Sequence, residues 1–159
     1  MSRHNRSRIV CGPRQRPYFP VDNLESAVIY PAESGAFPPE RVAEVLAAVG
    51  LPALAQRLSE EAHWGRILSL GEQQRLGIAR AILHAPDYLF LAEATASLDE
   101  PSEEKLYRLL HERLPRATIV SIGHRSTLAV FHNRRLTLLP KGSGHHIHAS
   151  PVEQEPAVP

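Results

Sequence analysis

The chain has little that would cross-link it covalently or place it in a membrane. Cys11 is the single cysteine among 159 residues, which excludes an internal disulfide and suits a reducing compartment. No apolar run approaches the roughly 20 residues of a membrane-spanning helix, and no apolar core of a signal peptide follows the polar start MSRHNRSR. We therefore expect no direct membrane insertion, so that any membrane association comes through a partner.

The chain also lacks a strong excess of either charge. Lys and Arg total 18 and Asp and Glu total 17, giving a formal net charge of +1 at pH 7. This balance creates no long-range field that would select a polyanion, so we expect no nucleic-acid partner. With 43% hydrophobic and 22% charged residues, the composition is that of one globular domain.

The first part of the chain is predicted to be irregular and then helical. Residues 1–14 show no sustained hydrophobic period beyond a possible short strand at 9–11, and we expect them to be poorly ordered. The string PRQRPYFP is predicted to be a loop, since each proline fixes its own φ and disfavours helix in the residue before it. Apolar residues recur at helical spacing in 41–49 and more weakly in 54–58. Residues 15–66 therefore form a predicted helical layer.

From residue 67 onward the pattern alternates between helices and buried strands, which is typical of an α/β fold with parallel strands. Residues 141–159 are rich in Gly, His and Pro, have little to bury, and are expected to form a disordered tail. The predicted segments are 1–14, 15–66, 67–140 and 141–159. Within the third segment we predict a helix that Pro86 ends, a helix at 101–114, helical turns at 126–132, and strands at 88–91, 118–122 and 136–139.

The string LSLGEQQR places Ser69 and Gly71 at the start of a helix. Unpaired backbone N–H groups and the positive end of the helix dipole favour an anion there, so both residues are placed to meet a phosphate. Serine is also a common N-cap residue, and capping alone would explain Ser69 as an ordinary structural residue. The motifs farther along the chain favour the phosphate interpretation.

The string YLFLAEATASLDE is a buried strand that ends in a carboxylate. Ligands of open α/β sheets bind at the carboxyl ends of the strands, so Glu93 is placed to orient a water toward a γ-phosphate as a general base. The alternative for Glu93 is a solvated or capping glutamate. Asp99 is predicted to cap the helix that follows, and the same residue can face a partner subunit.

Weaker signals come from a histidine and a glutamine. His124 follows a second buried strand in SIGHR, where an imidazole can donate a hydrogen bond to a γ-phosphate, although a lone histidine is usually structural. Gln15, in the proline-rich loop, can reach a metal or an attacking water, although an isolated loop glutamine is normally just solvated. We predict no protein metal site, because the tail histidines lack acidic or cysteine partners: His145, His146 and His148.

Taken together, LSLGEQQRLGIARAILHAPDYLFLAEATASLDE and SIGHR resemble the ATP-binding cassette of ABC transporters, from about Gln15 to Leu139. Together with QRPYFP upstream, these motifs are most similar in sequence to the bacterial SbmA/BacA and YddA-type group. The resemblance implies an α/β, partial P-loop NTPase (ABC cassette) fold, with a helical subdomain followed by parallel strands alternating with helices. It implies ATP and Mg²⁺ as ligands, and a second ABC cassette and a transporter membrane domain as partners. It also implies a cytoplasmic location, or a peripheral one at the cytoplasmic face of the bacterial inner membrane.

The resemblance assigns a role to each candidate residue. Gln15 resembles the Q-loop glutamine, which couples the nucleotide site to the membrane domain. Glu93 resembles the catalytic glutamate after Walker B, Asp99 the D-loop aspartate and His124 the H-loop histidine. The signature residues that contact ATP held by the opposite subunit are matched by Ser69, Gly71 and Glu72.

The sequence departs from the family pattern at positions that matter for hydrolysis. Ala92 stands where Walker B has the aspartate that holds the magnesium shell, and a methyl group cannot accept a hydrogen bond or balance the charge of a metal ion. The chain carries no G-x-x-x-x-G-K-[ST] loop, and Arg14 replaces the proline usual before the Q-loop glutamine. We therefore expect a truncated cassette with weakened ATP binding and hydrolysis at its own site.

Three hypotheses follow from the sequence. The first is a truncated cassette related to ATP-driven transmembrane transport and impaired in hydrolysis on its own. The second is a non-catalytic interaction module that docks on an intact ABC ATPase. The third, a cassette from DNA repair or translation, has no coiled-coil arm or basic stripe in its favour.

Overall fold

The computed structural model of the chain describes residues 8–11, 18–20, 22–123, 126–142 and 144–152. The chain divides into two compact units, Met1–Gly123 and His124–Pro159, and each is considered by itself. Among the described residues, no helix combines the length and the apolar character needed to cross a membrane.

The first unit contains a three-stranded parallel sheet. Its strands are β1 (Arg8–Cys11), β4 (Tyr88–Ala92) and β5 (Thr118–Ile122), in the order β1-β4-β5. Both pairings are parallel, which confirms the predicted α/β class. The strand expected only as a possibility at 9–11 pairs with β4, so that segment has a defined place in the sheet. Because the strands run the same way, the carboxyl ends of β4 and β5 meet at one edge.

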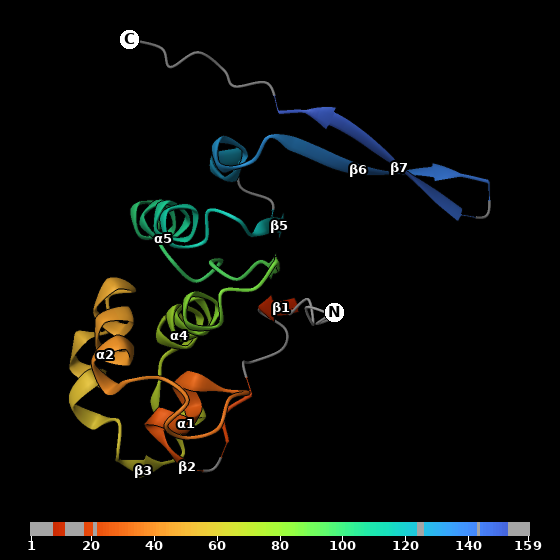
Figure 1. The fold of residues 1–159 in the computed structure, drawn as a ribbon. Helices are drawn as coiled ribbons and strands as arrows, with labels where there is room; N and C mark the ends of the chain where they lie inside the picture. The colour runs from red at the N-terminus through yellow and green to blue at the C-terminus, as the bar shows by residue number, and fades with distance from the viewer. Residues whose placement is uncertain (1–7, 12–17, 21, 124–125, 143, 153–159) are drawn as a thin grey trace, which may run out of the picture. The chain divides into compact units, whose positions relative to one another are not determined.

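Two helices lie on the same side of this sheet: α4 (Leu70–His84) and α5 (Glu100–Arg113) (Figure 1). Their apolar stripes form a core with alternate residues of β4, of which Leu89 and Leu91 are buried. The helix and strand predictions for this region are confirmed to within a few residues, because long periodic segments bury a face that the sequence displays directly.

The helical part of this unit comprises α1 (Leu24–Ile29), α2 (Pro39–Ala48), the 3₁₀ helix η1 (Pro52–Arg57) and α3 (Trp64–Ile67). A short antiparallel pair, β2 (Asp22–Asn23) and β3 (Glu61–Ala62), lies on either side of α1, α2 and η1 in the sequence and precedes α3. Helix α1 was not predicted, although Asn23 accepts a hydrogen bond from the backbone N–H of Ser26 at 2.9 Å and so caps it. Helices α2 and α5 are joined by an ion pair between Glu44 and Arg113 at 2.7 Å.

Two polar side chains, one buried and one half-buried, attach α4 to the preceding segments. The Arg80 guanidinium donates from Nε to the carbonyl oxygen of Ala27 and from Nη2 to that of Tyr18, both at 2.8 Å. His84 Nε2 lies 2.8 Å from the carbonyl oxygen of Ile29. An arginine buried in this way has its charge compensated by backbone carbonyls, which ties the helical part to the sheet-covering helix.

The second unit contains the 3₁₀ helix η2 (Ser126–Phe131) and an antiparallel hairpin of β6 (Arg134–Lys141) and β7 (Gly144–Pro151). The hairpin corrects the expectation of a disordered tail at 141–159, since residues 144–151 form a strand. The composition of that segment offered no apolar alternation, and it is the backbone pairing with β6, including Leu138 opposite Ile147, that orders it.

Candidate functional site

The candidate site is built around the start of helix α4. Ser69 is the N-cap, and its hydroxyl oxygen accepts a hydrogen bond from the Glu72 backbone N–H at 3.3 Å. In return, the Glu72 carboxylate accepts from the Ser69 backbone N–H at 2.8 Å and from the Ser69 hydroxyl at 2.7 Å. This reciprocal pair is a capping box, so Ser69 does have the structural role weighed from the sequence.

The capping box leaves backbone N–H donors available at the N-terminus of α4, the segment Ser69 to Gly71 that we call the mouth of α4. Among the described residues, no partner is found for the backbone N–H groups of Leu70 and Gly71, the first two positions of α4. Ser69 and Leu70 are exposed. The start of the helix therefore combines free N–H groups, a hydroxyl and the positive end of the helix dipole, which is the chemistry that binds a phosphate oxygen.

The backbone just before Ser69 is fixed by a buried glutamine. The Gln73 side-chain amide donates from Nε2 to the carbonyl oxygen of Leu68 at 2.8 Å and to that of Gly65 at 3.2 Å. Gln73 is 4% exposed, so these bonds are shielded from water. They join α3 to α4 and fix the backbone that leads into Ser69.

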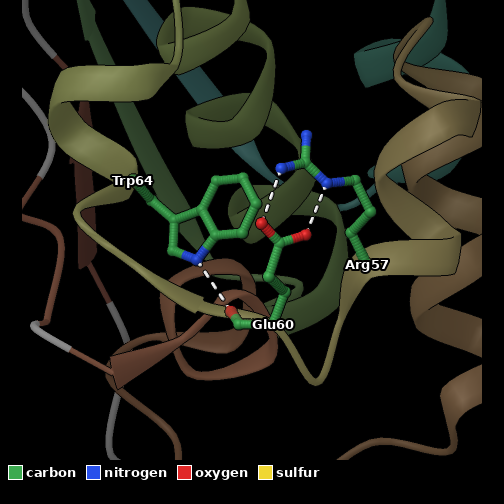
Figure 2. Close-up of polar contacts among 3 residues, drawn as sticks. All are labelled: Arg57, Glu60 and Trp64. Atoms are coloured by element: carbon green, nitrogen blue, oxygen red, sulfur yellow. Dashed lines mark hydrogen bonds and ion pairs between the residues drawn. The ribbon is translucent and has the colours of Figure 1, made fainter.

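A cluster around Trp64 supports the same segment (Figure 2). The fully buried indole donates from Nε1 to the carbonyl oxygen of Glu60 at 3.1 Å. The Glu60 carboxylate accepts two hydrogen bonds from Arg57, at 2.7 and 2.8 Å, and the Arg57 guanidinium lies 4.7 Å from the centre of the Trp64 ring. The Arg57–Glu60 pair is partly exposed and so adds little free energy, whereas the buried indole fixes the backbone at the start of α3, just before the string LSLGEQQR.

Glu93 follows directly on the end of β4. Its backbone N–H donates to the carbonyl oxygen of Ile122, the last residue of β5, at 2.7 Å. Its φ is +48°, in the left-handed region that non-glycine residues rarely adopt. Its side chain is exposed. The carboxylate is therefore held outside the sheet edge by a strained backbone, at the place where ligands of open α/β sheets bind.

The loop after Glu93 returns to the start of α4. A Cβ atom on Gly71 would lie 3.4 Å from Cδ2 of Leu98, so the signature glycine and this loop are in close approach. Gln74, 7% exposed, accepts a hydrogen bond from the Ser97 backbone N–H at 3.3 Å. The structure thus brings the two longest motifs of the sequence together on one surface.

Asp99 ends the loop and caps α5. Its carboxylate accepts a hydrogen bond from the Ser102 backbone N–H at 3.1 Å, which confirms the predicted cap. Hydrogen bonds from the Ser102 side chain and backbone, with a smaller contribution from the charge of Arg75, hold the pKa of the Asp99 carboxyl below its usual value. Asp99 is exposed, and so it remains ionised at neutral pH while facing solvent.

A buried polar network lies beneath the loop, and sequence reasoning missed it. The Thr95 hydroxyl donates to the Glu103 carboxylate at 2.5 Å, and the Tyr107 hydroxyl donates to the Ser121 hydroxyl at 2.9 Å. Thr95, Glu103 and Tyr107 are each at most 2% exposed. Burial raises the pKa of the Tyr107 phenol, and the nearby charge of Glu103 adds to the rise. In the sequence, Glu103 is no more than an acid in the first turn of a predicted helix, where the helix dipole favours it.

Two candidate residues, Gln15 and His124, lie outside the described residues, and their predicted roles stay predictions. Within the described ranges, no group of three or more His, Cys, Asp or Glu side chains is arranged to hold a metal ion. At the end of β4 the residue before Glu93 is Ala92, whose methyl group offers no ligand.

Comparisons with known proteins identify the family and the fold of the chain. The sequence profile described as ABC transporter matches residues 3–96, so the match begins upstream of Gln15, where the resemblance was expected to start. An uncharacterized ABC transporter ATP-binding protein of Haemophilus influenzae is 51% identical over 128 residues, which is 80% of this chain and 22% of that protein. The inner membrane ABC transporter ATP-binding protein YddA of Escherichia coli is 43% identical over 83 residues, 52% of this chain and 15% of that protein.

Among solved structures, a bacterial Atm1-family ABC exporter with ATP bound matches with a TM-score of 0.67 and 27% sequence identity, over 81% of this chain and 23% of that chain. The fold is therefore that of a partial ABC cassette, within the P-loop NTPase class of α/β proteins. The chain belongs to the ABC transporter family. It spans about a fifth of the length of the relatives it matches, and the predicted resemblance to the YddA-type group is confirmed.

Proposed function

We propose that this chain is an ABC cassette that takes part in ATP-driven transmembrane transport and that hydrolyses ATP poorly at its own site. The observation that carries the proposal is Ala92, which ends β4 immediately before Glu93. In the family pattern this position holds the aspartate that orders the magnesium shell. Because a methyl group neither coordinates nor hydrogen-bonds, the residues present do not suit Mg²⁺ at this strand end.

The residues that are present suit phosphate binding and the orientation of a water rather than the binding of Mg²⁺. The Ser69 hydroxyl and the N–H groups of Leu70 and Gly71 are able to hold phosphate oxygens of ATP, and Glu93 is able to accept a proton or to orient a water at the sheet edge. The sequence contains no G-x-x-x-x-G-K-[ST] loop that would hold the same phosphates from the other side. A second ABC cassette that holds these phosphates from the other side is therefore one proposed partner, and a transporter membrane domain, with which cassettes of this family pair, is the other.

Turnover of ATP tests this proposal directly. We expect the purified chain to release no phosphate from Mg-ATP above a buffer blank, while an intact ABC cassette assayed in parallel does. A92D is the informative variant, because it restores the aspartate but not the missing phosphate loop, and it is expected to stay inactive. Robust hydrolysis by the unaltered chain would contradict the proposal, and robust hydrolysis by A92D alone would show that Ala92, and not the phosphate loop, limits turnover.

A second candidate function is a non-catalytic module that docks on an intact ABC ATPase. The observation that favours it is the exposed mouth of α4, where Ser69 and Leu70 face solvent and the N–H groups of Leu70 and Gly71 have no partner among the described residues. In such a module, the N–H groups at the start of α4 bind the phosphates of ATP held by the partner. A pull-down with an intact cassette discriminates: association that requires ATP supports docking, and no association in any nucleotide state excludes it.

A further inference from the structure

The loop between Glu93 and Asp99 rests on a buried acid that the proposed chemistry does not use. Glu103, on α5, is 2% exposed, and its carboxylate accepts a hydrogen bond from the Thr95 hydroxyl at 2.5 Å. Glu104, the next residue, shows the ordinary alternative, since it is exposed and pairs with Arg108 at 2.6 Å. Two adjacent acids on one helix therefore have different surroundings, and the burial of the Glu103 carboxylate requires an explanation.

We propose that Glu103 is a positioning residue that, through Thr95, locks the loop carrying Glu93 and Asp99 against the sheet. The inference rests on the proposed function, because it concerns the same ATP-facing surface. Burying a carboxylate costs free energy unless it is hydrogen-bonded, and an apolar side chain would fill the same space without that cost. What an apolar side chain would not supply is an acceptor for Thr95.

The strain at Glu93 shows why such a lock is needed. A non-glycine residue at φ +48° persists only where the surrounding structure leaves no alternative. On one side, Glu93 is held by the bond from its N–H to Ile122. On the other side its carbonyl oxygen accepts from the Ala96 N–H at 3.0 Å, and the Thr95 carbonyl oxygen accepts from the Leu98 N–H at 2.9 Å. Thr95 belongs to both turns, the one closed by the Ala96 N–H and the one closed by the Leu98 N–H. A hydrogen bond that fixes the Thr95 side chain therefore restrains both turns.

The network also reaches the neighbouring strand. Tyr107 lies one helical turn beyond Glu103, is 1% exposed, and donates from its hydroxyl to Ser121 on β5 at 2.9 Å. Ser121 precedes Ile122, the residue that accepts from the Glu93 N–H. Helix α5 therefore contacts the loop through Glu103 and the end of β5 through Tyr107, and both contacts bear on the position of Glu93.

Hydrogen exchange of the loop amides tests the lock in the free chain. The probes are the N–H groups of Glu93, Ala96 and Leu98, each of which donates a backbone hydrogen bond. T95V keeps the shape of the side chain but removes the hydroxyl, and we expect it to accelerate exchange of these amides on the order of tenfold. T95S keeps the hydroxyl and is expected to restore most of the protection. E103Q, with a neutral acceptor, is expected to fall between T95V and the unaltered chain.

Two controls separate local release of the loop from general destabilisation. T118V makes the same chemical change at an exposed threonine of β5 and is expected to leave the loop amides unchanged. The amides of Ile78 and Ala79 in the core of α4 report global unfolding. Unchanged loop exchange in T95V would overturn the proposal, and so would equal acceleration of the loop and the α4 amides.

A binding measurement connects the lock to the site. With a slowly hydrolysed ATP analogue and the intact cassette of the Haemophilus influenzae relative, T95V is expected to associate more weakly than T95S and T118V by on the order of tenfold. Equal association of all three would overturn the positioning role. If the unaltered chain does not associate at all, the docking function fails, while the exchange experiment still decides whether Glu103 and Thr95 hold the loop.

Discussion

Gln74 Oε1 accepts a hydrogen bond from the backbone N–H of Ser97 at 3.3 Å. The glutamine belongs to the string LSLGEQQR, and the serine belongs to the loop between Glu93 and Asp99. Gln74 is 7% exposed, so the contact is largely shielded from water. One amide group therefore makes the start of α4 and the loop after β4 parts of one surface, and motifs separated in the sequence move together.

Removing the acceptor at position 74 should weaken that connection. Q74M keeps the length and the apolar stem of the side chain but leaves the Ser97 N–H without its protein partner. We expect the free energy of unfolding, measured by urea denaturation, to fall by less than about 1 kcal/mol, because Q74M also removes Nε2, a buried donor without a hydrogen-bond partner. Q56M, at an exposed glutamine of η1, is the control. Equal stability of the two variants would show that the Gln74 contact contributes nothing.

The cap of α4 makes a separate prediction. S69A removes the hydroxyl that accepts the Glu72 N–H, and we expect a loss of about 1 kcal/mol in the free energy of unfolding. The same change at Ser59, an exposed residue in a turn, should have little effect. Thermal denaturation of both variants checks this expectation. A S69A protein as stable as S59A would contradict the capping box.

The backbone of Glu93 predicts a gain in stability on substitution. Glycine adopts positive φ without a steric cost, so E93G should relieve the strain and raise the free energy of unfolding by roughly 1 kcal/mol. E93Q retains the side-chain volume and the strain, and it should leave stability unchanged. Urea denaturation distinguishes the two variants. A E93G protein less stable than E93Q would show that residue 93 is not strained in the folded chain.

Tyr107 gives the fold a dependence on alkaline pH. Its pKa is raised above the ordinary 10.0 by burial first, and then by the charge of Glu103. A group with a raised folded pKa binds its proton more tightly in the folded state, so its contribution is complete below the unfolded pKa of about 10 and is lost as the pH rises through the folded pKa. Stability should therefore fall above about pH 10. Y107F should be less stable at neutral pH, because the bond to Ser121 is lost, but should show a shallower alkaline decline in urea denaturation.

Much of the fold near the site was predictable because it is encoded locally. The apolar period of α4, the buried run of β4 and the cap at Asp99 each lie within a short stretch of sequence, and each prediction is confirmed. The pairing of β1 with β4 joins residues 8–11 to residues 88–91, and no local pattern specifies a partner so far away. Strand β7 was missed for a different reason, since it follows β6 directly but its composition shows no apolar alternation.

The candidate site likewise contains residues that local motifs indicate and residues whose surroundings depend on contacts distant in the sequence. Ser69, Gly71, Glu93 and Asp99 were found from motifs, since each stands at the end of a helix or strand where its position follows from the element. Glu103 was missed because its sequence signal, an acid in the first turn of a helix, is satisfied equally by a solvated residue. Its contact with Thr95 joins the loop to α5, and no helical spacing rule indicates that contact.

The central claim is that the mouth of α4 offers phosphate contacts to ATP held by another cassette, and G71D tests it most directly. An aspartate at the second position of a helix is favourable for the helix dipole, and its Cβ would be in ordinary van der Waals contact with Leu98 at 3.4 Å, so the variant should remain folded. Its carboxylate should repel the phosphates. The measurement is association of the chain with an intact cassette, with and without ATP. The account predicts that the unaltered chain associates only with ATP and that G71D, equally stable, does not associate. ATP-dependent association of G71D as strong as that of the unaltered chain would contradict it.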